Sequence, residues 1–216
     1  MLKTYRLRNL LMAGQITAPE LETLLRKKDY LGALYDLRND RVWMADILQN
    51  PMAMAVVTAS ETAMTAMTAM LAQEISRTMM LASEIAMGAV VGSETAMAAV
   101  LASDATLVAI LASETALSAI NSSSLAKEAL FLSTRKQTRS FSYNNSGNTF
   151  WTNIATGRGF FVRFKGNASS SHNIRVDETK EIPILGADFF SIIPYTSKLE
   201  FQNHSGGEVH YIPLGA

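Results

Sequence analysis

The sequence predicts an α+β multidomain chain with a small helical N-terminal anchor, an alanine-rich helical repeat shaft and a C-terminal antiparallel β-sandwich head. Three observations lead to this fold class. All 17 aromatic residues lie within the first 43 residues or from residue 131 onward. Nine of the 12 methionines fall in the aromatic-free middle, between residues 52 and 97. The same middle segment repeats itself every ten residues, which is typical of an extended repeat architecture.

Proline and glycine mark the same divisions of the chain. Proline is absent from residue 52 to residue 182, and eight of the 12 glycines follow residue 146. The composition therefore changes near residues 50 and 130. We divide the chain into a helical anchor or docking region at 1–50, a repeat shaft at 51–126, a linker at 127–139 and a β-sandwich head at 140–216.

Charge and cysteine content exclude several classes of function. With 19 basic and 19 acidic residues, the total charge gives no reason to expect nucleic acid as a partner. Basic and acidic residues number eight and six in 1–50, one and six in 51–126, and ten and seven in 127–216. Cysteine is absent and the three histidines lack metal-ligand spacing, so we expect no disulfide, no metal site and no cofactor.

The N-terminal region predicts three short helices. Thr17-Ala18-Pro19-Glu20 combines a capping box with a proline in the first turn, so a helix begins there. A second helix is expected over residues 30–37, and a third from residue 39 or 40 until Asn50-Pro51 ends it. We interpret the region as a helical cap with an aromatic core, or as a docking module for a larger assembly. A small positive charge disfavours a DNA-binding helix-turn-helix.

Four consecutive copies of a decapeptide begin at Ser83, and serines stand at positions 83, 93, 103, 113 and 123. An earlier copy begins at Ser60, and an insertion around Met67 and Met70 precedes the return of the ten-residue phase at Gln73. Ala, Met, Leu and Glu favour helix over strand. Either one continuous helix forms, or each Ser-Glu or Ser-Asp caps a new short helix and the chain winds as a solenoid. We favour the continuous helix because glycine and proline are nearly absent.

A helix that is apolar on every face must be buried against copies of itself or against its own chain. If the helix is continuous, this requirement predicts a homo-oligomer. A membrane span is not expected, because the carboxylates between Glu61 and Glu114 leave at most 12 uncharged residues in a row.

The C-terminal region predicts a compact β-sandwich of short strands separated by turn residues. Pro183 marks one strand as an edge strand, because proline cannot donate to a neighbouring strand. Turns are expected at residues 156–159 and 205–207. The expected strands cover residues 149–154, 160–164, 173–177, 181–184, 189–193, 199–202 and 209–212.

No catalytic constellation is visible in this region. Asp177, Glu178 and Glu181 form a charged turn that we interpret as solvated, and no phosphate loop or nucleophile elbow occurs. Aromatic, amide and guanidinium side chains are the types that stack on or hydrogen-bond a sugar. The candidate ligand-binding residues are Tyr143, Asn144, Asn145, Trp151 and Arg158.

The stretch Ser-Glu-Thr-Ala-Met-Ala-Ala-Val at 93–100, repeated in tens, resembles the Ala/Ser/Met decapeptide arrays of tail-fibre and other structural proteins from tailed bacteriophages. The resemblance covers residues 51–120. It implies attachment to the particle through the N-terminal end, trimeric assembly, and a host-recognition or decorative role for the head.

We therefore expect a non-enzymatic, homotrimeric tail fibre of a virion. It would be assembled in the host cytoplasm without a signal peptide, because the apolar run behind the first cations is too short for one. Other virion proteins would bind residues 1–50, and a host-surface glycan or protein would bind the head. A head or collar fibre, a bacterial or prophage-encoded surface adhesin and a polysaccharide hydrolase are the alternatives.

Overall fold

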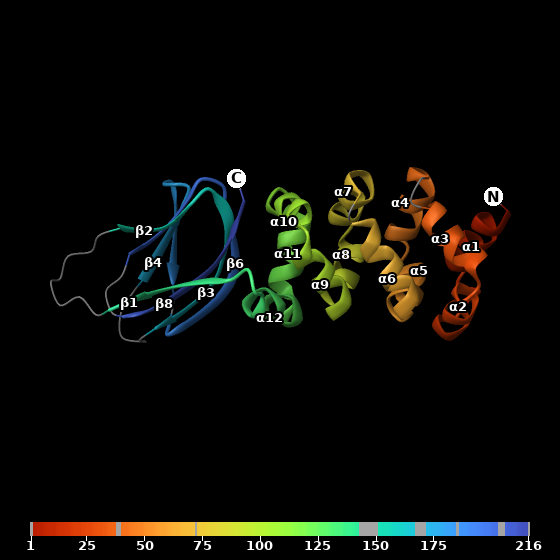
Figure 1. Ribbon diagram of the computed structural model, residues 1–216, viewed down its shortest axis with the longest axis horizontal. Helices are drawn as coiled ribbons and strands as arrows, with labels where there is room; N and C mark the ends of the chain where they lie inside the picture. Colours follow the sequence, from red (N-terminus) through yellow and green to blue (C-terminus); the bar gives the residue numbers. More distant parts are fainter. Residues whose placement is uncertain are drawn as a thin grey trace. The chain divides into compact units, whose positions relative to one another are not determined.

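The computed structural model describes residues 2–37, 40–71, 73–142, 151–166, 172–184, 186–202 and 206–215. Within these residues the chain forms twelve α-helices followed by eight β-strands (Figure 1). The mixed helix and strand content confirms the coarse fold class. The chain divides into two compact units, Met1–Ala126 and Lys127–Ala216. The predicted linker at 127–139 holds the second half of the last helix and the first residues of the first strand.

Leucines form the core of the N-terminal helices. Leu7, Leu11 and Leu21 are fully buried, whereas Tyr5 is 54% exposed and its ring lies 6.0 Å from that of Trp43. The expectation of an aromatic core is therefore wrong, because the leucines occupy the inward positions of these amphipathic helices. The four helices are α1 (Leu2–Met12), α2 (Ala18–Leu25), α3 (Lys28–Leu37) and α4 (Arg41–Gln49).

Local capping explains where these helices begin. The predicted capping box is present, because the backbone N–H of Thr17 donates to Glu20 Oε2 at 2.8 Å. Asp40 Oδ1 accepts from the backbone N–H groups of Val42 and Trp43, both at 3.0 Å, and so starts α4. Residues 2–12 form α1, a helix that we did not predict from the sequence.

The alanine-rich middle consists of short helices, so the continuous helix that we favoured is wrong. Successive helices turn sharply, by 98° between α8 and α9 and by 100° between α10 and α11. The helices are α5 (Pro51–Thr58), α6 (Glu61–Met70), α7 (Glu74–Ala82), α8 (Glu84–Val91), α9 (Glu94–Ala102), α10 (Asp104–Leu111), α11 (Glu114–Ser122) and α12 (Ser124–Leu132).

The repeated serines are the reason that the helices restart. Ser83, Ser93, Ser103 and Ser113 have extended backbones, and each Oγ accepts from the backbone N–H three residues later, at 3.2 to 3.3 Å. Such a cap satisfies an N–H that the helix leaves unpaired. The carboxylate that follows each serine lies in the first helical turn, where the helix dipole favours negative charge. The decapeptide is thus a cap followed by a short helix.

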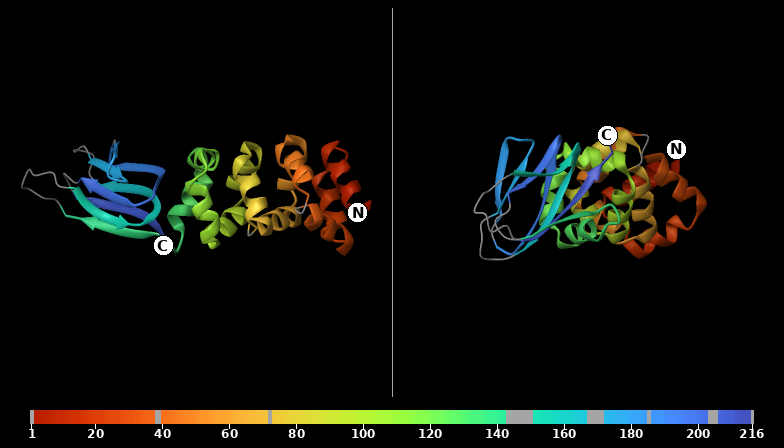
Figure 2. Two further views of the ribbon diagram at one scale, coloured as in Figure 1. Left: turned by 90° about the horizontal axis from the view of Figure 1, so that it is seen from above. Right: turned by 60° about the vertical axis from the view of Figure 1, so that its left-hand side comes forward.

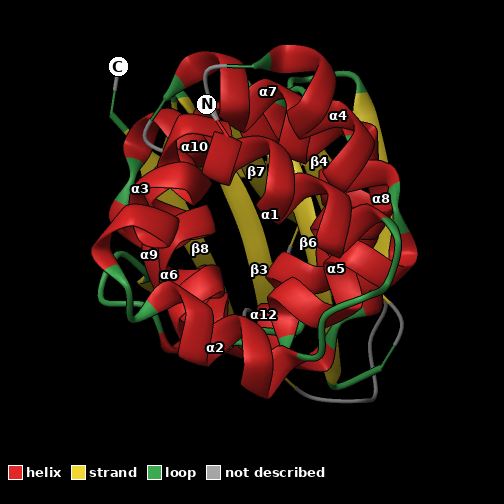
Figure 3. Cartoon of the chain, turned by 90° about the vertical axis from the view of Figure 1, so that its right-hand side faces the viewer, coloured by secondary structure: helices red, strands yellow, loops and turns green. Residues whose placement is uncertain are grey.

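The helices of the first unit also pack over a longer interval. They follow one another in chain order (Figure 2) and are distributed around the unit instead of lying in one plane (Figure 3). Each of α5 to α8 contacts the helix three further along. Within one decapeptide, Ala86, Met87 and Val90 are at most 1% exposed. These three apolar side chains are therefore buried within a single chain.

The second unit contains two four-stranded antiparallel sheets, with strand orders β1-β8-β3-β6 and β2-β7-β4-β5. Phe161, Phe164 and Tyr195 of the first sheet share one hydrophobic cluster with Leu199 and Phe201 of the second. Strands β2 to β8 correspond to the seven predicted strands, β5 with its proline lies at an edge as predicted, and β1 was not predicted. The strands are β1 (Gln137–Phe141), β2 (Trp151–Thr156), β3 (Arg158–Gly166), β4 (His172–Val176), β5 (Lys180–Ile184), β6 (Asp188–Tyr195), β7 (Lys198–Gln202) and β8 (Gly207–Leu214).

Candidate functional site

The sheet β2-β7-β4-β5 has one face that is not turned toward the hydrophobic cluster. Side chains alternate between the two faces of a strand, and Leu199, Phe201 and Ile174 belong to the cluster. Their sequence neighbours on β7 and β4 therefore lie on the opposite face, together with their cross-strand partners on β2. We call this surface the Trp151 face, and its members are Trp151, Asn173, Arg175, Lys198, Glu200 and Gln202.

Strand register places these residues in two rows. In the first row, Gln202 pairs with Trp151 on one side and with Asn173 on the other. In the second row, Glu200 pairs with Asn153 and with Arg175. The two rows therefore cross three neighbouring strands at adjacent levels of one sheet.

A closed network of charges occupies the second row. Arg175 Nε donates to Glu200 Oε2 at 2.6 Å, and Lys198 Nζ lies 2.9 Å from Glu200 Oε1. The bond from Arg175 lowers the pKa of the Glu200 carboxyl, burial opposes this effect, and Lys198 adds to the lowering. The same bond raises the pKa of Arg175. Glu200, only 4% exposed, is therefore a paired carboxylate that positions two cations.

Trp151 and an amide pair occupy the first row. The guanidinium carbon of Arg175 lies 4.4 Å from the Trp151 ring centroid, which is a cation–π contact that holds the half-buried indole on the sheet surface. Asn173 Nδ2 donates to Gln202 Oε1 at 3.0 Å. This bond leaves Asn173 Oδ1 as an acceptor and Gln202 Nε2 as a donor. The face thus offers a fixed ring beside neutral polar groups.

Two of the five predicted ligand-binding residues lie within the described part of the chain, and the structure does not bring them together. Trp151 starts β2, whereas Arg158 starts β3 on the other sheet and donates from Nε to the carbonyl of Gly215 at 3.2 Å. The length of β2, about 17 Å, separates the two residues. Tyr143, Asn144 and Asn145 lie outside the described residues.

Sequence reasoning missed the other members of the Trp151 face. The polar side chains of Asn173, Arg175, Lys198, Glu200 and Gln202 alternate with apolar residues in the two predicted strands. That alternation indicates that these side chains lie on an outward face of the sheet, and it is the sequence feature that could have identified them. It does not show which strands are neighbours, because that depends on contacts between distant segments.

Asp177 has a structural role, because its carboxylate binds the turn between β6 and β7. The interpretation of a solvated acidic turn is therefore wrong for this residue. Its carboxylate accepts from the backbone N–H groups of Thr196, Ser197 and Lys198 at 2.7 to 3.2 Å, and from the hydroxyls of Thr196 and Ser197. Burial raises the pKa of Asp177, but the hydrogen bonds led by Ser197 and Thr196 outweigh it and leave the pKa below its usual value. Its acceptor capacity is used within the fold.

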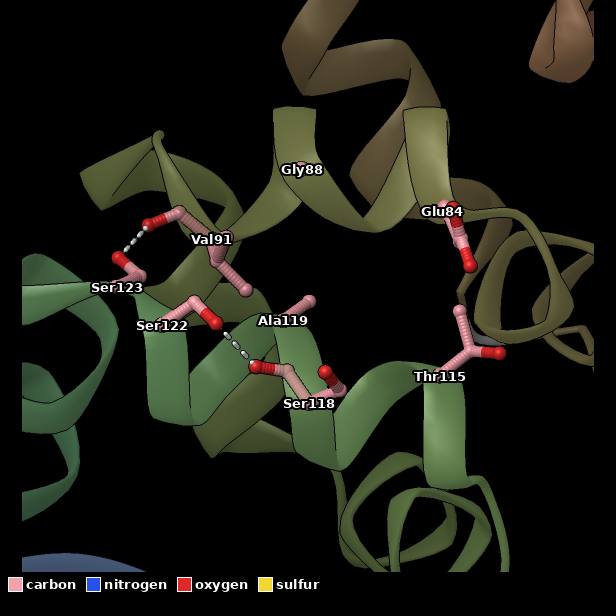
Figure 4. A pocket seen from close by; sticks show the side chains of 8 residues that line it. All are labelled: Glu84, Gly88, Val91, Thr115, Ser118, Ala119, Ser122 and Ser123. Carbon is pink, nitrogen blue, oxygen red and sulfur yellow. Dashed lines mark hydrogen bonds between the residues drawn. The ribbon is translucent and has the colours of Figure 1, made fainter.

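A second concave surface lies between α8 and α11 in the first unit (Figure 4). Small side chains at facing positions leave a groove of about 400 Å³, at one end of which Glu84 and Thr115 face each other. Ser123 Oγ donates to the carbonyl of Val91 at 2.8 Å, and Ser122 Oγ donates to that of Ser118 at 2.9 Å. Glu84 is the one ionisable residue among the described residues that line the groove, and no hydrogen bond between it and Thr115 is present there.

Three cationic side chains surround the ring of Phe131 of α12 in the second unit. Lys136 Nζ, Arg163 Cζ and Lys165 Nζ lie 4.1, 4.8 and 5.1 Å from its ring centroid. The ring also makes an edge-on contact with His210 at 5.1 Å. Burial, followed by Lys136, lowers the pKa of His210, and Glu208 opposes this shift. We interpret the cluster as packing of α12, because the ring satisfies the cations that surround it.

The described residues contain neither a metal-ligating cluster nor a single membrane-spanning helix. In that part of the chain, no group of three or more His, Asp or Glu side chains can hold a metal ion. No single described helix is long and apolar enough to cross a membrane; α8 with α9 and α10 with α11 reach that length only as bent pairs.

No protein-family model matches the sequence, and no curated protein matches it either.

Proposed function

We propose that this protein is a non-enzymatic structural component of a tailed-phage particle, namely a fibre. In this proposal residues 1–50 attach to other virion proteins, residues 51–126 form a solenoid shaft, and residues 140–216 form a β-sandwich head. The head presents the Trp151 face to the host surface.

One observation carries the proposal: the decapeptide serines join parts of the chain about three helices apart. Ser113 Oγ and Ser123 Oγ donate to the carbonyls of Leu81 and Val91, in both pairs 32 residues earlier. Repeats of this kind can be extended by adding further copies, because each contacts only its near neighbours. A long run of Ala, Ser and Met that contributes packing and caps suits a spacer better than an enzyme. The decapeptide resemblance points to the same class of protein.

The prediction of a homo-oligomer depended on the need to bury an apolar helix. Since Ala86, Met87 and Val90 are buried within one chain, that physical reason no longer requires partners. The trimer stays a prediction that follows from the resemblance alone. The mass of the full-length protein in solution tests it, with 23.5 kDa expected for a monomer and three times that mass for a trimer.

The test of the fibre is immunogold labelling with an antibody raised against the full-length protein. Labelling of thin projections on purified phage particles is expected, and their position separates a tail fibre from a head or collar fibre. Labelling confined to the bacterial envelope would overturn the proposal in favour of a surface adhesin. Release of reducing ends from host glycans by the purified protein would overturn the non-enzymatic role.

A further inference from the structure

We propose that the Trp151 face binds a neutral saccharide chain, with Trp151 as a stacking platform and the Asn173–Gln202 amide pair as the hydrogen-bonding group. This inference rests on the proposed function, in which the face is presented to the host surface, and it names the class of ligand. It uses described residues only.

The first step is the position of the indole. Trp151 is half-buried on the face opposite the hydrophobic cluster and keeps solvent-exposed surface, although an indole of its size would gain more by full burial. The guanidinium carbon of Arg175 lies over one face of the indole, 4.4 Å from the ring centroid, and holds the ring in place. The negative face of an aromatic ring attracts weakly positive C–H groups, which line one side of a pyranose ring. An ordered ring of this kind costs little entropy when a ligand binds.

The second step is the match between amides and hydroxyls. Gln202 stands between Trp151 and Asn173 in one row, and neighbouring strands are about 4.8 Å apart, so the row spans about 10 Å. The Asn173–Gln202 bond orients both amides, and within the described residues it leaves Asn173 Oδ1 able to accept and Gln202 Nε2 able to donate. A hydroxyl both donates and accepts, so vicinal sugar hydroxyls satisfy both groups at once. The ring and the amides can thus contact the same ligand.

The third step is the charge. Arg175 and Lys198 are both engaged by Glu200, with contacts of 2.6 and 2.9 Å, and Lys198 also lies 3.1 Å from Glu178. An anionic sugar would meet the Glu200 carboxylate in the adjacent row and would have to compete with it for both cations. A neutral chain avoids this competition. The face therefore favours an uncharged saccharide over an acidic one.

The experiment measures binding of neutral hexasaccharides (maltohexaose, cellohexaose and chitohexaose) and of an acidic one, hexagalacturonate, to the full-length protein. Trp43→Phe serves as the background, so that the remaining fluorescence comes from Trp151. A change in that fluorescence with at least one neutral probe is expected, with a Kd on the order of 1 mM or tighter. The change should be insensitive to salt.

Matched variants assign the binding to the face. Isothermal titration calorimetry measures binding by all variants, because the Trp151 variants lack the fluorescent reporter. Trp151→Ala should weaken binding roughly tenfold or more, as loss of a stacking ring does, whereas Trp151→Phe should retain most of it. Gln202→Ala should weaken binding while the fluorescence of Trp151 stays present as a reporter. Arg158→Ala, which changes a half-buried arginine on the other sheet, should leave binding unchanged. Thermal melts of each variant show that the fold is kept.

Three results would overturn the inference: no response to any neutral probe, tighter binding of the acidic probe, or equal binding by the Trp151→Ala and Arg158→Ala variants. These results are distinguishable from failure of the fibre. Labelled fibres without saccharide binding would reject the ligand alone, whereas saccharide binding with label only on the bacterial envelope would reject the fibre alone.

Discussion

Ser113 uses one hydroxyl for two bonds that link distant parts of the first unit. Its Oγ accepts from the backbone N–H of Ala116 at 3.2 Å, which caps α11, and donates to the carbonyl of Leu81 in α7 at 2.8 Å. Ser123 repeats the arrangement with Ala126 and Val91. A carbonyl near the end of one helix, which has no partner within that helix, is thus satisfied by the cap of a later helix.

Replacing Ser113 by alanine should destabilise the first unit more than loss of a cap alone. Ser113→Ala removes the cap and leaves the Leu81 carbonyl without its partner, so we expect a loss of about 2 to 3 kcal/mol. Urea unfolding of the full-length protein, followed by far-UV circular dichroism, measures the change.

Ser93→Ala is the matched control for Ser113→Ala. Ser93 caps α9 by accepting from Ala96 at 3.3 Å, and among the described residues no bond from its hydroxyl to a distant carbonyl is present. Its replacement should cost about 1 kcal/mol. Ser113→Thr, which keeps the hydroxyl, should cost less than Ser113→Ala. Equal losses at Ser93 and Ser113 would contradict the role of the distant bond.

Asp177 should make the second unit sensitive to acid. Its folded pKa lies below the usual value, so its contribution to stability is present above the unfolded pKa of about 3.9 and is lost as the pH falls through the folded value. Asp177→Asn should lower stability near neutral pH by about 1 to 3 kcal/mol, because hydrogen bonds to a charged acceptor are lost. Below the folded pKa the difference between the two proteins should shrink.

Denaturant midpoints at about pH 6 and about pH 3 measure this difference. Trp151 fluorescence in the Trp43→Phe background reports on the second unit alone. Asp188 and Glu200 also have lowered pKa values, but both are present in the two proteins that are compared. A gap between them that stays constant with pH would show that the Asp177 carboxylate is not the titrating group.

Glu178→Gly should stabilise the turn between β4 and β5. Glu178 has a φ of 61°, in the left-handed region that costs an L-residue about 1 to 2 kcal/mol and costs glycine little. The expected net gain in stability is about 0.5 to 1 kcal/mol. It is smaller than the strain relieved, because glycine also increases the entropy of the unfolded chain. Glu178→Ala is the control, because it removes the exposed ion pair with Lys198 and keeps the strained backbone. A higher thermal midpoint for alanine than for glycine would refute the strain.

Tyr195→Phe should leave the second unit equally stable or stabilise it by about 1 kcal/mol. The Tyr195 hydroxyl is buried and, among the described residues, has no hydrogen-bond partner, and burial raises its pKa. Removing an unsatisfied polar group costs nothing in hydrogen bonding. Tyr211→Phe is the comparison, because the Tyr211 hydroxyl donates to Gln137 Oε1 at 2.9 Å and its loss should cost about 1 kcal/mol. Chemical denaturation that ranks the two variants in the opposite order would contradict this assignment.

Some features of this protein follow from the sequence because they are local. The alternation in β7, the capping box at Thr17 and the proline that restricts β5 to an edge each depend on residues a few positions apart. The decapeptide period was visible too, and it corresponds to one cap and one short helix. The near absence of glycine and proline nevertheless favours a continuous helix at the level of sequence, which the serine caps prevent in the fold.

Tertiary structure decided the rest. The bond between Ser113 and Leu81 spans 32 residues. It depends on bends of about 100° between helices and on burial of apolar side chains against the helix three further along the chain. Neither is a property of one decapeptide. The Trp151 face likewise requires the order β2-β7-β4, which brings residues about 50 positions apart in sequence into one row. Local chemistry selects helices and strands, whereas long-range burial and strand pairing determine which of them meet.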